Sequence, residues 1–260
     1  MIGITTVTIA GMGLLCGAAL ALAARFLGVH EDPRIEQITE LLPGANCGGC
    51  GYAGCADYAR AIVLEGAAIN LCAPSGEDML RKLADLLGVQ AEAQEKKVAI
   101  VLCGGSDAQA GRSFLYNGVA DCAAAHAVAG GDKLCRYGCL GYGSCVRACP
   151  VGAIELRDRL AVVHPELCIG CGACVRACPR GLIQLVPVSR HIHVLCSSKD
   201  KGPAVKKACK VGCIGCTMCV KLAANDAIRM DGALAVVDYS KELDNDKVVE
   251  KCPTNCIVKR

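Results

Sequence analysis

The middle of the chain carries cysteines at short, regular spacing. From Cys168 they recur as Cys-x2-Cys-x2-Cys-x3-Cys-Pro, ending at Cys178 and Pro179. Thiolates at this spacing hold an iron–sulfur cube, with three ligands from one tight loop and the fourth serving a second cube. The spacing therefore predicts [4Fe–4S] clusters, whose chemistry is one-electron transfer.

The stretch just before this motif repeats it imperfectly. It ends with the same Cys-x3-Cys-Pro, at Cys145 and Cys149, but Tyr142 occupies the slot of a second ligand and Cys135 stands upstream instead. In two-cluster ferredoxins the fourth cysteine of each motif binds the cluster of the other motif. The same arrangement here predicts two clusters. One set is Cys149, Cys168, Cys171 and Cys174, and the other is Cys135, Cys139, Cys145 and Cys178. The alternative is a pair of zinc sites, although zinc usually takes two separated cysteine pairs.

A different cysteine motif lies nearer the N-terminus. Its pattern is Cys-x2-Cys-x4-Cys-x16-Cys, at Cys47, Cys50, Cys55 and Cys72. Glycines around the first three let the backbone fold closely and aim N–H groups at sulfur. We expect another [4Fe–4S] cluster here, with a helix over residues 56–65 leading to the fourth ligand. A zinc knuckle is the alternative, but the motif contains no His.

The C-terminal part contains half of a further two-cluster motif. The cysteines present are Cys213, Cys216 and Cys219 at the first spacing, and Cys252 before a proline. The slots for the other cluster hold Ala223, Glu242, Asn245 and Val248. Because all four ligands of one cluster are missing together, the four cysteines present predict a single [4Fe–4S] cluster. Cys256 is left without a role.

An internal repeat flanks the central motif. The same pattern occurs in residues 96–107 and 190–200, where a strand is followed by Cys, two small residues and, shortly after, Asp. Each unit is followed later by a Cys-x3-Cys segment. Four cysteines of these units belong to no motif above: Cys103, Cys122, Cys196 and Cys209. They could complete one additional cluster. Buried structural cysteine is the alternative.

Small elements must position these motifs. Residues 152–156 and 160–164 alternate as a short antiparallel pair would, and the two VRACP segments read as short helices. With 22 Cys, six Tyr, two Phe and no Trp, the chain favours small metal-stabilised modules over one apolar core. We predict an α+β chain in five parts. They are a membrane anchor (1–28), an N-terminal [4Fe–4S] domain (29–90), a strand-and-turn unit (91–134), a two-cluster ferredoxin module (135–188), and a second strand-and-turn unit with a one-cluster module (189–260).

The N-terminal run from Ile2 to Ala24 contains no charged residue. As a helix it would extend about 34 Å, enough to cross a bilayer. A cleaved signal peptide is the alternative, but no basic residue precedes the run and the run is long for such a peptide. Arg25 and Arg34 follow it, which predicts a single-pass anchor with the remainder in the cytoplasm. Cys16 would then be an ordinary apolar residue of the helix rather than a metal ligand.

Other functional classes find little support. A formal charge of +3 and no basic patch interleaved with aromatics argue against nucleic-acid binding. The cysteine spacings are ligand spacings, which predicts a reducing compartment rather than a disulfide scaffold. No nucleotide-binding glycine loop follows a strand, and the five His are scattered. Because each predicted cluster has four protein ligands, no iron is open to a substrate and electron transfer remains.

The apolar N-terminus and the motifs PGANCGGCGYAGC, KLCRYGCLGYGSCVRACP and KCPTNCIV together resemble the RnfB family, the iron–sulfur subunits of Rnf complexes. The resemblance covers nearly the whole chain, and the missing C-terminal cluster departs from it. It implies a translocase subunit, without a substrate-converting site of its own, that takes electrons from reduced ferredoxin and passes them to membrane and flavin-bearing subunits. It implies that transfer toward NAD+ or another acceptor drives Na+ or H+ translocation at the cell membrane. The alternatives are a subunit of a hydrogenase or heterodisulfide reductase, and a structural zinc protein.

A lysine-rich segment follows the second repeat. Its members are Lys199, Lys201, Lys206, Lys207 and Lys210. This positive charge would attract an acidic ferredoxin. An ordinary solvated face is the alternative.

Overall fold

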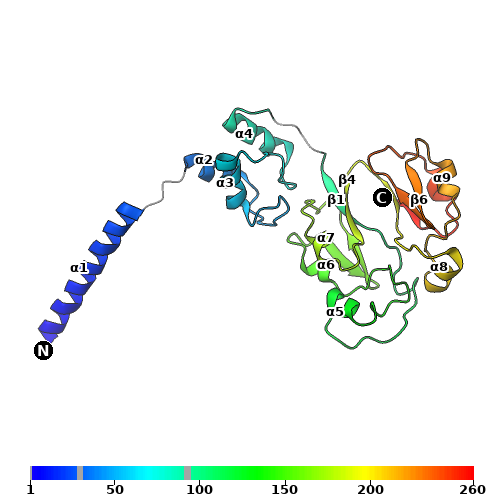
Figure 1. Cartoon of the computed structure of the whole chain (residues 1–260), viewed down its shortest axis with the longest axis horizontal. Coiled ribbons are helices and arrows are strands. Elements are labelled where there is room, and N and C mark those ends of the chain that lie inside the picture. Colours follow the sequence, from blue (N-terminus) through cyan, green and yellow to red (C-terminus); the bar gives the residue numbers. More distant parts are fainter. Residues whose placement is uncertain (1, 28–31, 91–94) are drawn as a thin grey trace.

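The computed structural model describes residues 2–27, 32–90 and 95–260, and no side chain of residues 2–8 or 24. Short helices alternate with pairs of short strands along these ranges, which is an α+β architecture (Figure 1). The boundaries predicted near residues 28 and 91 lie outside the described residues. The elements fall into an N-terminal helix, a small helical unit, a central unit and a C-terminal unit.

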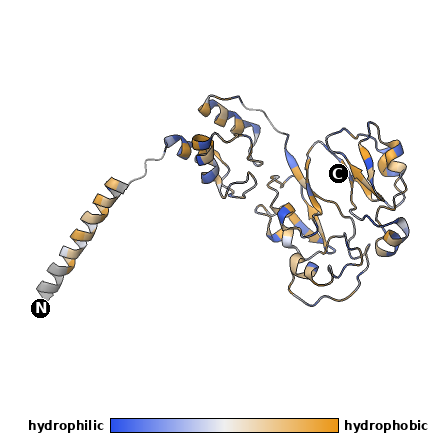
Figure 2. Ribbon diagram, viewed as in Figure 1, coloured by the Kyte–Doolittle hydropathy of each residue, from blue (hydrophilic) through white to orange (hydrophobic). Residues whose placement is uncertain are grey.

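Helix α1 (Ile2–Leu27) extends away from the other elements (Figure 1). Apart from Arg25, its described side chains are apolar (Figure 2), and large ones such as Leu14 and Phe26 are more than three-quarters exposed. A helix was predicted here and is present. Over the described residues, none of the helices has the length and apolar character needed to cross a membrane.

Three helices form the small N-terminal unit. They are α2 (Pro33–Leu41), α3 (Cys55–Glu65) and α4 (Glu77–Leu87). Helix α3 confirms the helix predicted over residues 56–65, and it ends at Gly66 in the left-handed conformation that glycine adopts without strain. Ile38, Tyr58 and Leu83, one from each helix, are almost completely buried in one apolar cluster. This cluster also contains Cys72, so the core of the unit reaches its cysteine loop.

The central unit is built on two antiparallel strand pairs. The pairs are β1 (Lys97–Val101) with β4 (Ile183–Pro187), and β2 (Ile154–Arg157) with β3 (Leu160–Val163). The second pair confirms the predicted hairpin. The unit's helices are α5 (Cys122–Ala127), α6 (Ser144–Arg147) and α7 (Ala173–Ala177), of which the last two confirm the helices predicted at the VRACP segments.

The C-terminal unit has the same order of elements. Its strand pairs are β5 (Ile192–Val194) with β8 (Ile257–Lys259), and β6 (Ile228–Asp231) with β7 (Leu234–Val237). Its helices are α8 (Gly202–Ala208), α9 (Met218–Leu222) and α10 (Lys247–Glu250). The series α9, β6, β7, α10, β8 therefore follows the series α6, β2, β3, α7, β4 of the central unit element by element.

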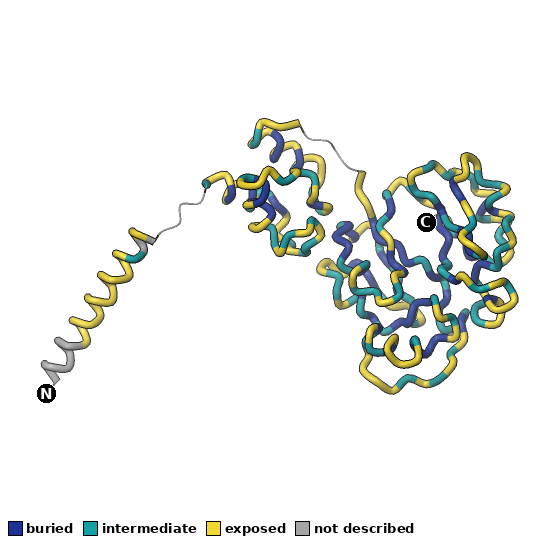
Figure 3. The backbone as a smooth tube through the Cα atoms, viewed as in Figure 1, coloured by how far each residue is buried: buried dark blue, intermediate teal, exposed yellow. Residues whose placement is uncertain are grey.

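Cysteines form part of the apolar cores. The central core packs Val98, Ile154 and Val186 with Cys139 and Cys168, and the buried segments follow the strand pairs (Figure 3). The C-terminal core likewise contains cysteines among its aliphatic side chains. Cores this small bury little apolar surface, so a metal group bound among them would add substantially to stability.

Candidate metal centres

All 22 cysteines are free thiols, and all except Cys16 fall into five groups in space. Each group gathers four or five thiols and contains no His. Among residues 2–27, 32–90 and 95–260, no cluster of three or more His, Cys, Asp or Glu is spaced to hold one metal ion.

The first predicted set lies at the start of α3. Cys55 is the first residue of the helix, and its backbone N–H donates to Asn46 Oδ1 at 2.8 Å. Gly48 turns the loop with φ +65°. Mainly burial, together with the charges of the other three cysteines of the set, raises the pKa of the Cys72 thiol to about 11. The structure thus brings the four predicted ligands together.

A cavity in the central unit is lined by the next predicted set. Its cysteines are Cys149, Cys168, Cys171 and Cys174. The backbone N–H groups of Ala99 and Ala153 donate to Cys168 Sγ at 3.4 Å and to Cys149 Sγ at 3.3 Å. Bonds of this kind stabilise negative charge on ligand sulfur. Soft thiols with N–H donors and no oxygen ligand fit a [4Fe–4S] cluster.

The other central cavity differs from the prediction in one residue. Its cysteines are Cys122, Cys139, Cys145 and Cys178, so Cys122 stands where Cys135 was expected. Asp121 explains this position, because its carboxylate caps α5 and also accepts the Ser144 hydroxyl hydrogen bond at 2.7 Å. The Ser144 hydroxyl in turn accepts the Cys122 N–H at 2.8 Å. The start of α5 is therefore fixed to the start of α6, beside Cys145.

Tyr142, in the slot of the absent ligand, has a structural role. Its hydroxyl donates to Asp132 at 2.8 Å, and the Arg159 guanidinium lies 4.2 Å from its ring centroid. Asp132 is fully buried and also pairs with Arg112. A buried carboxylate needs such partners. The Tyr142–Asp132 bond closes the loop that carries Cys135.

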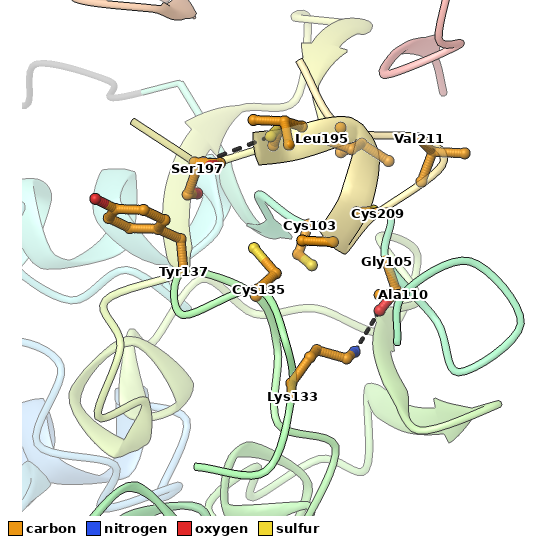
Figure 4. Close-up of a pocket in the computed structure, with 17 residues that line it drawn as sticks. Cys103, Gly105, Ala110, Lys133, Cys135, Tyr137, Leu195, Ser197, Cys209 and Val211 are labelled. Carbon is orange, nitrogen blue, oxygen red and sulfur yellow. Dashed lines mark hydrogen bonds between the residues drawn. The ribbon is translucent and has the colours of Figure 1, made fainter. Parts of the chain in front are cut away.

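A third cavity lies between the central and C-terminal units (Figure 4). Its cysteines are Cys103, Cys135, Cys196 and Cys209. The predicted additional set had Cys122 in place of Cys135. The structure brings the other three together and exchanges the fourth member. The spacing of cysteines along the chain did not indicate that Cys135 replaces Cys122 here. The internal repeat did indicate it, because Cys135 and Cys209 open equivalent Cys-x3-Cys segments.

Five cysteines line the C-terminal cavity. They are the predicted Cys213, Cys216, Cys219 and Cys252, together with Cys256. The sulfurs of Cys252 and Cys256 lie 3.6 Å apart. Hydrogen bonding from Cys256 lowers the pKa of Cys252 to about 5 and that of Cys213 to about 6, whereas the pKa of Cys256 itself is raised. The Cys252 and Cys256 thiols are therefore within hydrogen-bond reach of each other, and either can donate.

Burial raises the pKa values of several other thiols. It raises the pKa of Cys145 to about 12 and the pKa values of Cys174 and Cys219 to about 11. Thiols this basic are protonated at neutral pH, while the metal ligand is the thiolate. Metal binding in these cavities would therefore release protons.

Neighbouring groups touch through their own cysteines. The backbone N–H of Cys139 donates to Cys103 Sγ at 3.3 Å, which joins the second central group to the third cavity. The backbone N–H of Cys213 likewise donates to the Cys196 sulfur, which joins that cavity to the C-terminal group. At the other end, the charge of Cys47 adds to the effect of burial in raising the pKa of Cys171. Between the two central groups, the charge of Cys174 likewise adds to burial in raising the pKa of Cys145. The five groups thus form one continuous series.

Two known families match parts of the chain. A family described as "Putative Fe-S cluster" matches residues 42–74, the range of the first cysteine set. A family described as "4Fe-4S dicluster domain" matches residues 134–182, the range of the central motifs.

Similar proteins align with nearly the whole chain. The B subunit of the ion-translocating oxidoreductase complex of Methanosarcina acetivorans is 43% identical over 96% of this chain and 95% of its own length. The B subunit of the proton-translocating ferredoxin:NAD(+) oxidoreductase complex of Clostridium ljungdahlii is 42% identical over 95% of this chain and 88% of its own. The B subunit of the Na(+)-translocating ferredoxin:NAD(+) oxidoreductase complex of Acetobacterium woodii is 43% identical over 94% and 74%.

Proposed function

Because the chain belongs to the family of B subunits of ion-translocating oxidoreductase complexes, we propose that it is the iron–sulfur electron carrier of an Rnf-type complex. It accepts electrons from reduced ferredoxin and relays them toward the membrane and flavin-bearing subunits, in a complex that moves Na+ or H+. The names of the Clostridium and Acetobacterium relatives support ferredoxin as donor and NAD+ as acceptor.

Four cysteine sets would hold [4Fe–4S] clusters. They are Cys47, Cys50, Cys55 and Cys72; Cys149, Cys168, Cys171 and Cys174; Cys122, Cys139, Cys145 and Cys178; and Cys213, Cys216, Cys219 and Cys252. A cluster with four thiolate ligands supplies one-electron chemistry, at a potential set by hydrogen bonds, burial and charge. The chain's own contribution is the burial of these sulfurs and the N–H groups directed at them.

The observation that carries this proposal is the continuity of the cysteine groups. The first three groups adjoin one another: the charge of Cys47 adds to burial in raising the pKa of Cys171, and the charge of Cys174 adds to burial in raising the pKa of Cys145. Structural metal sites need no such succession, because each stabilises its own module. A protein that carries electrons from cluster to cluster does need each cluster to lie close to the next.

Helix α1 is proposed as a single-pass anchor in the cell membrane, with the cysteine-bearing units in the cytoplasm. From Ile2 to Ala24 the sequence carries no charge, and the described side chains of this stretch are exposed rather than packed on a core. Exposed apolar area of this extent favours lipid. A chain lacking residues 1–27 should leave the membrane fraction and keep all its iron, and membrane retention of that truncated chain would exclude the anchor.

The lysines around α8 are proposed as the ferredoxin-binding surface. Lys201, Lys206 and Lys207 are exposed, while the same helix lines the third cavity through Val205 and Ala208. Positive charge at this place would steer an acidic partner toward the cysteines beneath it. Replacing the three lysines by Glu should slow oxidation of reduced ferredoxin and weaken its salt dependence. A matched change of Arg81 and Lys82 on α4 should do neither, and equal rates in both variants would exclude this surface.

The function as a whole is tested by anaerobic purification of the full chain. We expect a brown protein with about four iron and four sulfide per cluster, whose EPR signals appear on reduction with ferredoxin. A colourless protein that contains zinc in place of iron would overturn the proposal. So would iron–sulfur clusters that reduced ferredoxin leaves oxidised.

A further inference from the structure

Four thiols from separate segments meet between the central and C-terminal units (Figure 4). Cys103 follows strand β1 and Cys196 follows strand β5, while Cys135 and Cys209 each begin a Cys-x3-Cys segment. Cys103 and Cys135 point into the same cavity in Figure 4. The four segments come from both units, so the cavity exists only where the units are packed together.

The internal repeat makes the two halves of this cavity equivalent. Cys103 and Cys196 occupy the same place after their strands, in CGGSD and CSSKD. Cys135 and Cys209 occupy the same place in CRYGC and CKVGC. Each repeat therefore contributes the same pair of cysteines, and Cys122 has no counterpart in this relationship.

Hydrogen bonds between the repeats hold the two strand ends side by side. The N–H of Gly104 donates to the Leu195 carbonyl at 2.9 Å. The hydroxyl of Ser197 donates to the Leu102 carbonyl at 2.8 Å. Each bond starts next to the cysteine of one repeat and ends next to the cysteine of the other, which fixes their separation.

Backbone donors reach the sulfurs in an equivalent way. Cys103 Sγ accepts the N–H of Cys139 at 3.3 Å, and the Cys196 sulfur accepts the N–H of Cys213. Cys139 and Cys213 are the second cysteines of the two Cys-x3-Cys segments. Cys196 Sγ also accepts the N–H of Ser198 at 3.4 Å. Donors of this kind stabilise thiolate charge in iron–sulfur sites.

A buried cation faces the same cavity. Lys133 is 4% exposed, lines the cavity, and donates from Nζ to the Gly105 carbonyl. Its charge reaches the Asp158 carboxylate, but no ion pair within 4 Å joins Lys133 to a carboxylate in the described ranges. A buried ammonium needs compensating negative charge. Thiolates bound to a metal group in this cavity would supply it.

We propose that Cys103, Cys135, Cys196 and Cys209 bind a further [4Fe–4S] cluster, shared by the two repeats. The site rests on the iron–sulfur function proposed above and extends it, because it joins the central groups to the C-terminal group. It also makes the packing of the two units dependent on iron, since each unit supplies two ligands.

The ligand set is tested by iron and sulfide counts with EPR on the full chain, purified without oxygen. The reference is a Cys103→Ala/Cys196→Ala chain, which should contain about four iron fewer than the wild type. Adding Cys135→Ala to this chain should remove no further iron. Adding Cys122→Ala should remove about four more, because Cys122 serves a different group. Cys16→Ala in the wild-type chain is the control and should change nothing.

Each outcome decides the assignment. Further iron loss with Cys135→Ala and none with Cys122→Ala would overturn the proposed ligand set. That result would place Cys122 in this site and Cys135 in the second central group. Unchanged iron in the reference chain would exclude the site while leaving the proposed function intact, whereas a wild-type chain without iron would remove both. If the double variant does not fold, single variants suffice: Cys135→Ala and Cys196→Ala should abolish the same EPR signal, and Cys122→Ala a different one.

Discussion

Arg176 donates a hydrogen bond from Nη2 to the carbonyl oxygen of Cys47 at 3.1 Å, joining α7 of the central unit to the N-terminal cysteine loop. The backbones approach even more closely next to this bond. A Cβ at Gly49 would lie 2.8 Å from the carbonyl oxygen of Cys171. Glycine is required here because any side chain would collide with the main chain of Cys171, a proposed ligand. The first two cysteine groups of the series are therefore held in direct contact.

Gly49→Ala should increase the distance between these two cysteine groups without removing iron from either of them. Overpacking of this kind costs about 1 to 3 kcal/mol, which the junction can relieve by opening. We expect unchanged iron content, and weaker magnetic interaction between the two reduced clusters in EPR spectra. Arg176→Ala should act in the same direction by about 1 kcal/mol, the value of one hydrogen bond.

Gly111→Ala is the matched control for the junction. A Cβ there meets only the Leu134 side chain at ordinary contact distance. Its spectra should match those of the wild type. Identical spectra in the Gly49 and Gly111 variants would mean that the observed contact does not bring the two groups together.

Cys252 and Cys256 should differ sharply when replaced, although both line the C-terminal cavity. The proposed ligand sulfurs of Cys149 and Cys178 each accept an N–H from the residue four positions later. Cys252 likewise stands directly before a proline and accepts from backbone N–H groups that include that of Cys256, which places Cys252 in the proposed ligand role. Cys252→Ala should therefore abolish the C-terminal EPR signal. Cys256→Ala should retain it, since the backbone donor remains; loss of the signal there would reverse the two roles.

Lys133 should raise the reduction potential of the cluster proposed between the repeats. A buried positive charge favours the more negative, reduced state. Lys133→Met should shift the midpoint of one EPR signal to a lower potential in a redox titration. Lys207, at the equivalent position of the second repeat, is exposed. Lys207→Met should leave all midpoints in place, and equal shifts in both variants would contradict a local effect of Lys133.

His193 should make the C-terminal unit less stable in mild acid. Burial lowers its pKa to about 4, with Arg260 and His191 adding to the effect, and its Nδ1 lies 3.0 Å from the Tyr239 hydroxyl. The native state therefore keeps this ring neutral while the unfolded chain protonates it near pH 6.5. Stability is complete above pH 6.5 and falls as pH decreases toward 4, by about 1.4 kcal/mol per pH unit at most.

Denaturant midpoints at pH 7.5 and 5.5 measure this loss. His193→Gln keeps a polar partner for Tyr239 but does not titrate, so its midpoint should fall less between the two pH values than that of the wild type. His126→Gln, at an exposed position outside this unit, is the control and should follow the wild type. A His193→Gln chain with the full wild-type pH dependence would show that other groups cause it.

Local spacing predicts most of the proposed ligands. Cysteines two or three residues apart share one turn, so their sulfurs must converge whatever surrounds them. That reasoning predicted the sets beginning at Cys47, Cys168 and Cys213, and the structure brings each together. Alternation of apolar residues likewise predicted the β2–β3 hairpin, because its two strands are adjacent in sequence.

Cysteine spacing did not place Cys122 and Cys135, and tertiary structure decided their positions, although the internal repeat pairs Cys135 with Cys209. Each lies in an irregular segment, and its neighbours are set by contacts distant in sequence: Asp121 with Ser144 for the first, and packing of one repeat against the other for the second. Spacing along the chain says nothing about such contacts, since loop closure leaves many partners equally accessible. The sequence by itself therefore determined that the protein gathers thiols for iron–sulfur chemistry. Only the packed units decided which thiols share a cavity and in what order the cavities follow one another.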